Sequence, residues 1–163
     1  MSKLNKFISS KEALIKAQNI CSQQEKCESD IRKKLFAWKA NPVDFDNIII
    51  LLKEDKFIDE QRYAISFAKE KFKFSKWGKI KIEYNLKQKN IPSEFILNAI
   101  DEINEKDYDL ILEKELYKKL KAIKGTDEYT IKTKLLRYAL SKGYENGKVF
   151  DMVSSILSKV KKN

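Results

Sequence analysis

The residues best suited to chemistry in this chain are lysines interleaved with aromatic side chains between residues 69 and 90. Eight lysines stand there against two glutamates, and the aromatic residues among them are Phe72, Phe74, Trp77 and Tyr84. Ammonium groups bind phosphates and carboxylates, and aromatic rings add apolar contact area and cation–π contacts. The stretch therefore predicts either a surface for an acidic partner or a helix pair with a well-solvated outer face.

Catalytic chemistry is poorly supported by the residue types. The chain has no histidine, so serine and cysteine nucleophiles lack their commonest base. Asp44, Lys53 and Glu54 could form a nuclease trio, but that chemistry normally requires a strand framework, which this sequence does not predict. We expect the carboxylates to stand mainly at helix starts, where negative charge is favourable; the pairs are Asp44 and Asp46, Asp59 and Glu60, Asp101 and Glu102, and Asp127 and Glu128.

Binding sites for metals, nucleotides and other cofactors are not expected either. The four glycines are isolated along the chain, so there is no glycine-rich phosphate loop. Cys21 and Cys27 are too few for a disulfide framework and, without histidine, for a zinc site. Both are expected to be reduced, and Cys21 continues an apolar stripe with Ala13, Ala17 and Ile20. The sequence thus predicts no catalytic residue, no cofactor and no metal.

The composition favours an all-α protein of one domain or of a few small units. Of 163 residues, 36% are charged and only 4 are glycine and 2 proline, too few for the turns of a sheet protein. The formal charge of +10 favours an acidic partner such as nucleic acid, a nucleoprotein or an acidic protein face. The sequence shows neither a secretory signal nor a membrane-length apolar run, so we expect a cytoplasmic protein without membrane contact.

Three stretches share one spacing of apolar positions, with intervals of five, five and four residues. They are Trp38, Val43, Ile48 and Leu52; Leu86, Ile91, Ile96 and Ile100; and Ala139, Tyr144, Val149 and Val153. The second position fits the residue just outside a helix start and the third fits the fourth helical residue, a pair that packs as a hydrophobic staple. Asn90 and Gly143 suit the left-handed turn before it, whereas Asn41 and Pro42 break the helix in the first copy.

A further amphipathic helix is expected ahead of each of these pairs, at 9–25, 59–74 and 105–124. Ser9 with Glu12 is typical of a capping box, and Asp59 is a favourable N-cap. Together these patterns predict tandem three-helix repeats with about nine helices. We place the three units at 9–55, 56–104 and 105–160 of one continuous domain, forming an elongated, curved solenoid.

One stretch admits a second interpretation. Between residues 71 and 84 the apolar residues alternate with lysines at the period of a strand, and Trp77–Gly78 could turn a β-hairpin. We favour a helix, a turn at 75–78 and a second helix, because the corresponding stretches 29–38 and 130–140 have helical spacing. In that second helix Trp77, Ile80 and Tyr84 share one side and Ile82 and Leu86 the other, as expected of a helix packed between neighbours.

Residues 56–91 resemble the middle of the RecX family of recombination regulators. The shared pattern is an acidic pair, an aromatic residue and alanine, a basic stretch, and a closing leucine before the next helix, met here by Asp59, Glu60, Tyr63, Ala64, Trp77, Gly78, Leu86, Lys89, Asn90 and Ile91. Weaker similarity extends over about residues 14–157. In many relatives an arginine- and serine-containing run stands where this chain has Gln24, Glu25, Lys26 and Cys27, and Asn90 replaces their usual glycine.

This resemblance implies tandem three-helix repeats and a small cytoplasmic protein that binds the RecA-type recombinase, chiefly as its filament on single-stranded DNA. It also implies that the protein lowers strand exchange and ATP hydrolysis by that recombinase, as a monomer and without catalytic residues of its own. An alternative is a helical protein that binds DNA directly through its basic face. For either partner, the candidate contact residues are Arg62, Lys71, Lys73, Lys76, Lys79, Lys81 and Lys87.

Overall fold

The computed structural model describes residues 6–125 and 127–161, which fold into nine α-helices and one 3-10 turn without any β-strand. The prediction of an all-α protein is confirmed. None of the helices in these ranges is long and apolar enough to span a membrane. The helices are α1 Ser10–Gln23, α2 Glu28–Ala37, α3 Phe45–Glu54, α4 Glu60–Lys73, α5 Lys79–Gln88, α6 Ser93–Asp101, α7 Glu105–Ala122, α8 Glu128–Ser141 and α9 Asn146–Lys161, and the 3-10 turn is Pro42–Asp44.

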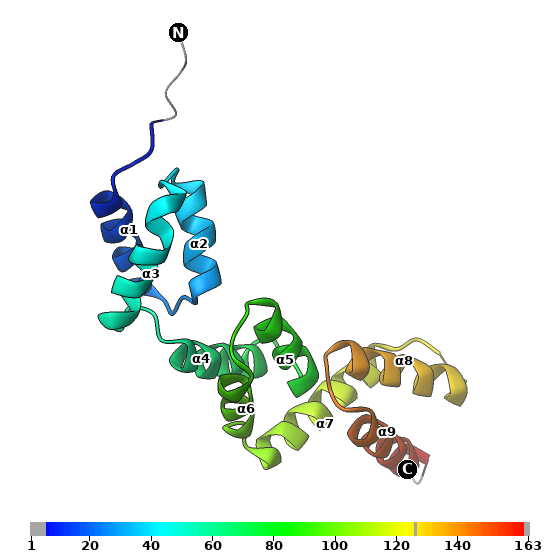
Figure 1. Ribbon diagram of the computed structural model, residues 1–163. Coiled ribbons are helices and arrows are strands. Elements are labelled where there is room, and N and C mark those ends of the chain that lie inside the picture. The colour runs from blue at the N-terminus through cyan, green and yellow to red at the C-terminus, as the bar shows by residue number, and fades with distance from the viewer. Residues whose placement is uncertain (1–5, 126, 162–163) are drawn as a thin grey trace.

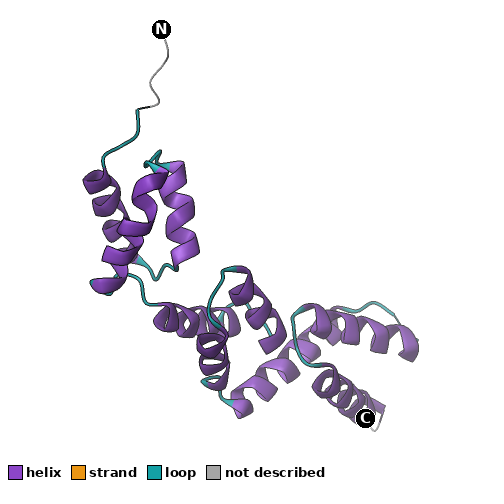
Figure 2. Ribbon diagram, in the orientation of Figure 1, coloured by secondary structure: helices purple, strands orange, loops and turns teal. Residues whose placement is uncertain are grey.

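The helices form three successive groups of three, which we call the first unit (α1–α3), the second unit (α4–α6) and the third unit (α7–α9). Figure 1 shows these units following one another along a bent path, with the chain ends at opposite ends of the molecule. Figure 2 shows that loops join the helices throughout. The predicted helical repeat with an elongated, curved shape is therefore confirmed.

Side-chain caps determine where several helices begin. Ser9 Oγ accepts a hydrogen bond from the backbone N–H of Glu12 at 3.1 Å, and Asp59 Oδ1 accepts one from Arg62 at 2.9 Å. These bonds satisfy donors that have no partner within the helix, so Ser9 and Asp59 are confirmed as N-caps, and of the predicted capping box the Ser9 half is present. The carboxylate pair 101–102 was expected at a helix start, but it lies at the end of α6, so that expectation is wrong.

The second helix of each unit ends in the same way. The second residue after the end of the helix has a left-handed backbone conformation. The residue that follows it donates its backbone N–H to the carbonyl five positions earlier, at 3.0 to 3.3 Å. This arrangement satisfies carbonyls at the helix end. The left-handed residue and its follower are Lys39 with Ala40, Asn90 with Ile91, and Gly143 with Tyr144. The predicted turns at Asn90 and Gly143 are confirmed, whereas in the first unit Lys39 takes this place.

The predicted apolar register is right in the second and third units and wrong in the first. The followers Ile91 and Tyr144 are buried, each five residues before another buried side chain, but Val43 is 80% exposed. Its place in the core is taken by Ala40, eight residues before Ile48. The difference arises because the 3-10 turn Pro42–Asp44 adds three residues to the loop between α2 and α3. Asn41 caps this turn by accepting a hydrogen bond from the Val43 N–H at 3.2 Å.

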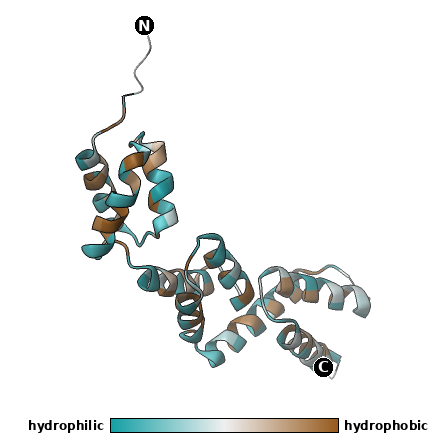
Figure 3. Cartoon of the chain, viewed as in Figure 1, coloured by the Kyte–Doolittle hydropathy of each residue, from teal (hydrophilic) through white to brown (hydrophobic). Residues whose placement is uncertain are grey.

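The basic stretch folds as a helix, a turn and a helix, so the preference over a β-hairpin is confirmed. Helix α4 ends at Lys73 and α5 begins at Lys79. The expectation that α5 packs on both sides is wrong, because Ile82 is fully buried while Ile80 and Tyr84 are 50% and 61% exposed. Hydrophobic and hydrophilic residues alternate along the helices in Figure 3, as expected of helices with one buried side.

Two hydrophobic clusters stabilise the described part of the chain. One lies within the first unit, and the other is shared by the second and third units and includes Cys27 from the start of α2. Both cysteines are free thiols, and burial raises the pKa of Cys21 to about 11 and also raises that of Cys27. The thiols therefore remain protonated near neutral pH and are weak nucleophiles.

The second and third units also meet through their backbones. The N–H of Gly78 donates to the carbonyl of Lys142 at 2.7 Å, and the N–H of Ile80 donates to the carbonyl of Gly143 at 3.0 Å. A Cβ on Gly78 would lie 2.3 Å from the Gly143 carbonyl carbon, so only glycine permits this approach. The contact fixes the start of α5 against the turn that precedes α9.

Candidate partner-binding surface

Three of the seven predicted contact residues are engaged in ion pairs. The pairs, cation first, are Arg62 with Glu25 at 2.6 Å, Lys79 with Glu105, and Lys87 with Glu83 at 3.0 Å. The Arg62–Glu25 pair connects the second unit with the first unit, and the Lys79–Glu105 pair connects the second unit with the third unit. The Lys87–Glu83 pair lies within α5. These cations are already balanced by carboxylates, so they add less to an external electrostatic surface than their number suggests.

Lys71 and Lys81 are brought together on one aromatic side chain. Their Nζ atoms lie 5.1 and 4.6 Å from the centre of the Trp77 ring, within the range of cation–π contacts. Neither lysine forms an ion pair with another described residue. Because the indole ring contacts their ammonium groups without neutralising the charge, these two lysines remain available to an anionic partner.

Lys73 and Lys76 lie elsewhere, at the end of α4. Together with Lys69, Leu110 and Lys114 they border a hollow of about 480 Å³ between α4 and α7. Lys76 has a left-handed backbone, with φ of 58°, and its Nζ donates to the carbonyl of Lys73 at 2.5 Å. The seven predicted residues therefore occupy separate surroundings and do not form one continuous patch.

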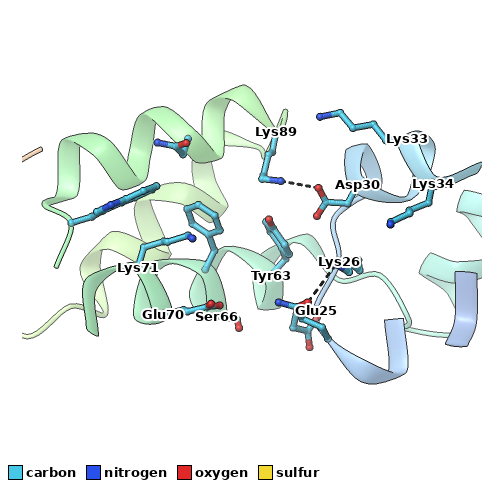
Figure 4. Close-up of a pocket in the computed structure, with 14 residues that line it drawn as sticks. Glu25, Lys26, Asp30, Lys33, Lys34, Tyr63, Ser66, Glu70, Lys71 and Lys89 are labelled. Atoms are coloured by element: carbon cyan, nitrogen blue, oxygen red, sulfur yellow. Dashed lines mark hydrogen bonds and ion pairs between the residues drawn. The ribbon is translucent and has the colours of Figure 1, made fainter. Parts of the chain in front are cut away.

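A groove of about 500 Å³ runs between the first and second units and contains further cations. The first unit supplies Lys26, Lys33 and Lys34, and the second supplies Lys71 and Lys89. Figure 4 shows these side chains on the two facing walls. Of the predicted residues only Lys71 lines this groove, with Lys81 close by on Trp77. The groove is thus a basic surface built from residues distant in sequence.

One ion pair bridges the walls of this groove. Lys89 Nζ lies 2.7 Å from Asp30 Oδ1, as the dashed line in Figure 4 marks. Burial opposes ionisation of Asp30, but hydrogen bonds from Lys89 and from Cys27 outweigh it and lower the pKa of this carboxyl. Asp30 is therefore ionised at neutral pH and balances Lys89. Glu25 is paired with Arg62, and Glu70 is the remaining carboxylate of the lining, so the lysines still leave an excess of positive charge in the groove.

An aromatic row lines the second-unit wall of the groove. The rings of Tyr63 and Phe67 are stacked at 5.9 Å, and Phe67 meets Trp77 edge to face at 6.3 Å. Tyr63 is buried, which raises its pKa, so its hydroxyl stays neutral. Phe67 and Trp77 are half-buried and pack against the core of the second and third units. This rigid wall holds Lys71 and Lys81 in place.

The possible nuclease trio does not come together in the structure. Asp44 precedes α3 and Glu54 ends it, so at 1.5 Å per residue their backbone positions are about 15 Å apart along the helix axis. Among the described residues there is also no cluster of three or more side chains able to hold a metal ion. The chemistry that this surface does offer is binding, through lysines held on aromatic rings.

Comparison with known proteins identifies the family. The model for the second three-helix domain of RecX matches residues 59–100, which span α4 to the end of α6. The regulatory protein RecX of Clostridium botulinum strain Eklund 17B is 35% identical over 162 residues, covering 94% of this chain and 74% of the relative. The chain belongs to the RecX family. RecX of Clostridium botulinum strain Alaska E43 is 32% identical over 160 residues, with the same shares covered.

Solved RecX structures share this fold. A crystal structure of regulatory protein RecX superposes with a TM-score of 0.81 at 23% identity, covering 90% of this chain and 71% of the other. RecX from Lactobacillus salivarius superposes with a TM-score of 0.75 at 19% identity, covering 94% and 97%. The resemblance noted from residues 56–91 is thereby confirmed, and the names of these relatives describe them as regulatory proteins.

Sequence reasoning missed the contribution of the first unit to this RecX surface. Lys26, Lys33 and Lys34 were not predicted because they stand outside the densest run of lysines in the sequence. Lys33 and Lys34 sit on exposed positions of α2, between the buried residues Ile31 and Leu35. Apolar spacing could have placed them on the outer face of α2. Their approach to α4 and α5 depends on how two units pack, which a local pattern does not contain.

Proposed function

We propose that this chain binds a RecA-type recombinase, chiefly as the filament formed on single-stranded DNA, and lowers its strand-exchange and ATPase activities. The family relationship supports a regulatory role in recombination. The observation that carries the proposal is the basic groove between the first and second units, with Lys71 and Lys81 unpaired beside it. Such a surface attracts both acidic protein faces and phosphates, and a nucleoprotein filament offers both.

The elongated shape supports contact with a filament rather than with one compact partner. Three similar units in a row present related surfaces at intervals, as repeat proteins do when they bind extended partners. We propose the units 9–55, 56–104 and 105–160 as parts of one continuous domain that acts as a cytoplasmic monomer. In this proposal the protein has no membrane contact, needs no cofactor and performs no catalysis of its own, so regulation arises from binding alone.

Direct binding to DNA is the second candidate function. It is favoured by the formal charge of +10 and by lysines that no described carboxylate neutralises. In that case inhibition of a recombinase would follow from masking of its DNA. The two functions predict different responses to free DNA, because only masking is relieved in proportion to the DNA added.

An ATPase assay separates these two candidates. A RecA-type recombinase is assembled on single-stranded DNA, the purified full chain is added, and ATP hydrolysis is followed with increasing duplex competitor. We expect inhibition that persists when competitor phosphates exceed those of the filament. Inhibition that falls in proportion to competitor would support DNA masking instead. Unchanged ATP hydrolysis and strand exchange at saturating protein would refute the proposed function.

A further inference from the structure

A second basic groove lies on the third unit, away from the predicted contact residues. It has a volume of about 680 Å³ and runs between the end of α7 and the side of α8. Among the described residues, four cationic side chains line it and no carboxylate does. They are Lys119 and Lys124 from the end of α7 and the residues beyond it, and Lys134 and Arg137 from α8.

These four cations have no carboxylate partner among the described residues, whereas Lys148 and Lys161 of the same unit each have one. Lys148 pairs with Asp109 at 2.5 Å, and Lys161 pairs with Glu128 at 2.9 Å. Like charges gathered around one hollow repel one another, and a bound anion relieves that repulsion. The groove is therefore an unsatisfied electrostatic site rather than an ordinary set of solvated ion pairs.

Tyr138 gives the groove a fixed wall. Its hydroxyl donates a hydrogen bond to Glu115 Oε2 at 2.7 Å, which holds the ring in place. Burial and the neighbouring Glu115 raise the pKa of Tyr138 to about 12, so the phenol is neutral at physiological pH. Lys119 Nζ lies 5.3 Å from the centre of this ring. At least one of the four cations is thus held by an aromatic surface, as Lys71 and Lys81 are held by Trp77.

The repeat relates this groove to the surface on the second unit. Lys134 stands nine positions before the left-handed residue Gly143, and Lys81 stands nine positions before Asn90. Figure 1 shows α5 and α8 on the same side of the molecule, opposite α6 and α9. In the groove beside the second unit, the carboxylates of Glu25, Asp30 and Glu70 offset part of the charge, but no carboxylate of a described residue lines the third-unit groove. Lysines therefore recur at equivalent positions of α5 and α8, the second helices of these two units.

We propose that the third-unit groove binds the phosphodiester backbone of a nucleic acid. Phosphates attract lysine and arginine without requiring a buried apolar contact. A docked protein segment would normally require apolar or aromatic anchors, and beyond the ring of Tyr138 this groove offers only Ala122 and Ile123. The site needs no recombinase and lies outside the surface proposed above, so it adds a separate nucleic-acid contact to the molecule.

Direct binding to oligonucleotides tests this site without any recombinase. Fluorescence anisotropy is measured with a labelled thymidine oligonucleotide, a duplex of the same length and a labelled polyglutamate peptide, at several salt concentrations. The test variant of the full chain carries Lys134→Glu and Arg137→Glu. The matched control carries Lys11→Glu and Lys106→Glu, which reverse two exposed lysines near helix starts and change the net charge equally. Circular dichroism verifies that both variants remain helical.

We expect the test variant to lose at least about tenfold in affinity for the single strand or the duplex, and the control to lose much less. For the single strand, the slope of log affinity against log salt should fall by about 1.4, because each phosphate that is no longer neutralised removes about 0.7. Equal losses in both variants, or no loss in either, would overturn the proposal. Polyglutamate binding as tight as that of the oligonucleotide, with the same sensitivity to Lys134→Glu and Arg137→Glu, would assign the groove to an acidic protein.

Discussion

Single residues in left-handed backbone conformation end several helices of this chain at a cost in stability. Besides Gly143, four described residues have positive φ angles near 60°, namely Lys39, Lys56, Lys76 and Asn90. For a residue with a Cβ this conformation costs roughly 1–2 kcal/mol, whereas glycine adopts it freely. The three lysines are therefore positions where the chain has not taken the most stable residue.

Lys56→Gly should stabilise the protein. The exposed Lys56 side chain forms no ion pair with a described residue, and its backbone φ is 60°. Relief of the left-handed strain, less the added flexibility of the unfolded chain, should raise the free energy of unfolding by about 0.5–1 kcal/mol. Urea denaturation measures this change in the free energy of unfolding. The same substitution within a helix, Lys118→Gly, should instead cost about 1 kcal/mol, and equal losses in both variants would contradict the argument.

Glu60 makes stability depend on pH in the direction opposite to most carboxylates. Its Oε1 accepts a hydrogen bond from the Glu28 N–H at 3.3 Å, but Oε2 is buried without a partner. Burial raises the pKa of Glu60 above its ordinary value of 4.5. Because the folded pKa exceeds the unfolded one, the contribution of Glu60 is fully present below pH 4.5 and is lost as pH rises through the folded value.

Glu60→Gln should therefore increase stability, relative to the native chain, more at neutral pH than at low pH. The difference in free energy of unfolding between variant and native protein should grow from pH 4.5 to pH 7.5, because only the native side chain becomes ionised in a buried place. Chemical denaturation at both pH values measures this difference. A difference that is the same at both, or that shrinks as pH rises, would show that burial does not govern this carboxyl.

At the scale of helices, the apolar pair at the start of α6 tests the register. Ile96 is 1% exposed and stands five residues after the buried Ile91, whereas the neighbouring Leu97 is 59% exposed. Ile96→Ala should lower the free energy of unfolding by about 2–4 kcal/mol, because it removes buried apolar contacts and leaves a cavity. Leu97→Ala should change it by less than about 0.5 kcal/mol. Thermal or urea unfolding compares the two, and a small effect at Ile96 would contradict the assigned packing.

Apolar spacing predicted the helices well where each unit keeps the same loop length. Ile91, Ile96, Tyr144 and Val149 were placed correctly because a buried residue beyond a helix end and another one turn into the next helix are linked by local geometry. Val43 was misplaced because the 3-10 turn lengthens that loop by three residues. The apolar spacing of the first unit still matched the other two, because Val43 happens to stand at the expected interval although it is exposed.

The candidate surface was predictable only in part, since its charges are set by contacts between units. The sequence predicted Lys71 and Lys81 as candidate contact residues, because they stand in the densest basic stretch. It did not indicate that Lys79 is paired with Glu105, which lies 26 positions away, or that Lys89 meets Asp30 across 59 positions. Such pairs depend on how whole units pack, and the apolar pattern within one unit carries no information about that packing.

At the scale of the whole molecule, the two junctions between units differ in kind. The first and second units meet through the buried side chain of Cys27 and through polar contacts such as Arg62 with Glu25 and Lys89 with Asp30. The second and third units share a hydrophobic cluster and a close backbone approach at Gly78 and Gly143. The latter junction should therefore be the more sensitive to small changes in shape, because backbone atoms have no freedom to move aside.

Gly143→Ala tests that junction. Gly143 has φ of 93°, and a Cβ there would lie 2.3 Å from the Cβ of Lys81. The left-handed backbone and the overlap together should lower the free energy of unfolding by roughly 2–4 kcal/mol. Gly147→Ala is the control, because a Cβ at that position meets nothing within 4 Å and alanine favours the helix. Calorimetry should show a lower melting temperature for Gly143→Ala alone, and equal melting temperatures would contradict the close approach.

The last prediction concerns the groove between the first and second units and the recombinase filament. Lys71→Glu combined with Lys81→Glu removes the two unpaired cations held on Trp77. The helical fold should survive, because solvated lysine heads rarely stabilise a core. Binding to the filament should weaken by at least about tenfold, and each single-strand phosphate that is no longer bound should reduce the slope of log affinity against log salt by about 0.7.

The control for this experiment is again Lys11→Glu with Lys106→Glu, which changes the net charge equally at exposed positions outside both grooves. Weaker filament binding by the Lys71 and Lys81 variant alone would identify the surface, since long-range attraction to the filament is then matched between variants. Equal weakening would mean that net charge acts without a defined site. If neither variant binds more weakly, the lysines on Trp77 form only a solvated face, and the filament must meet the protein on another surface.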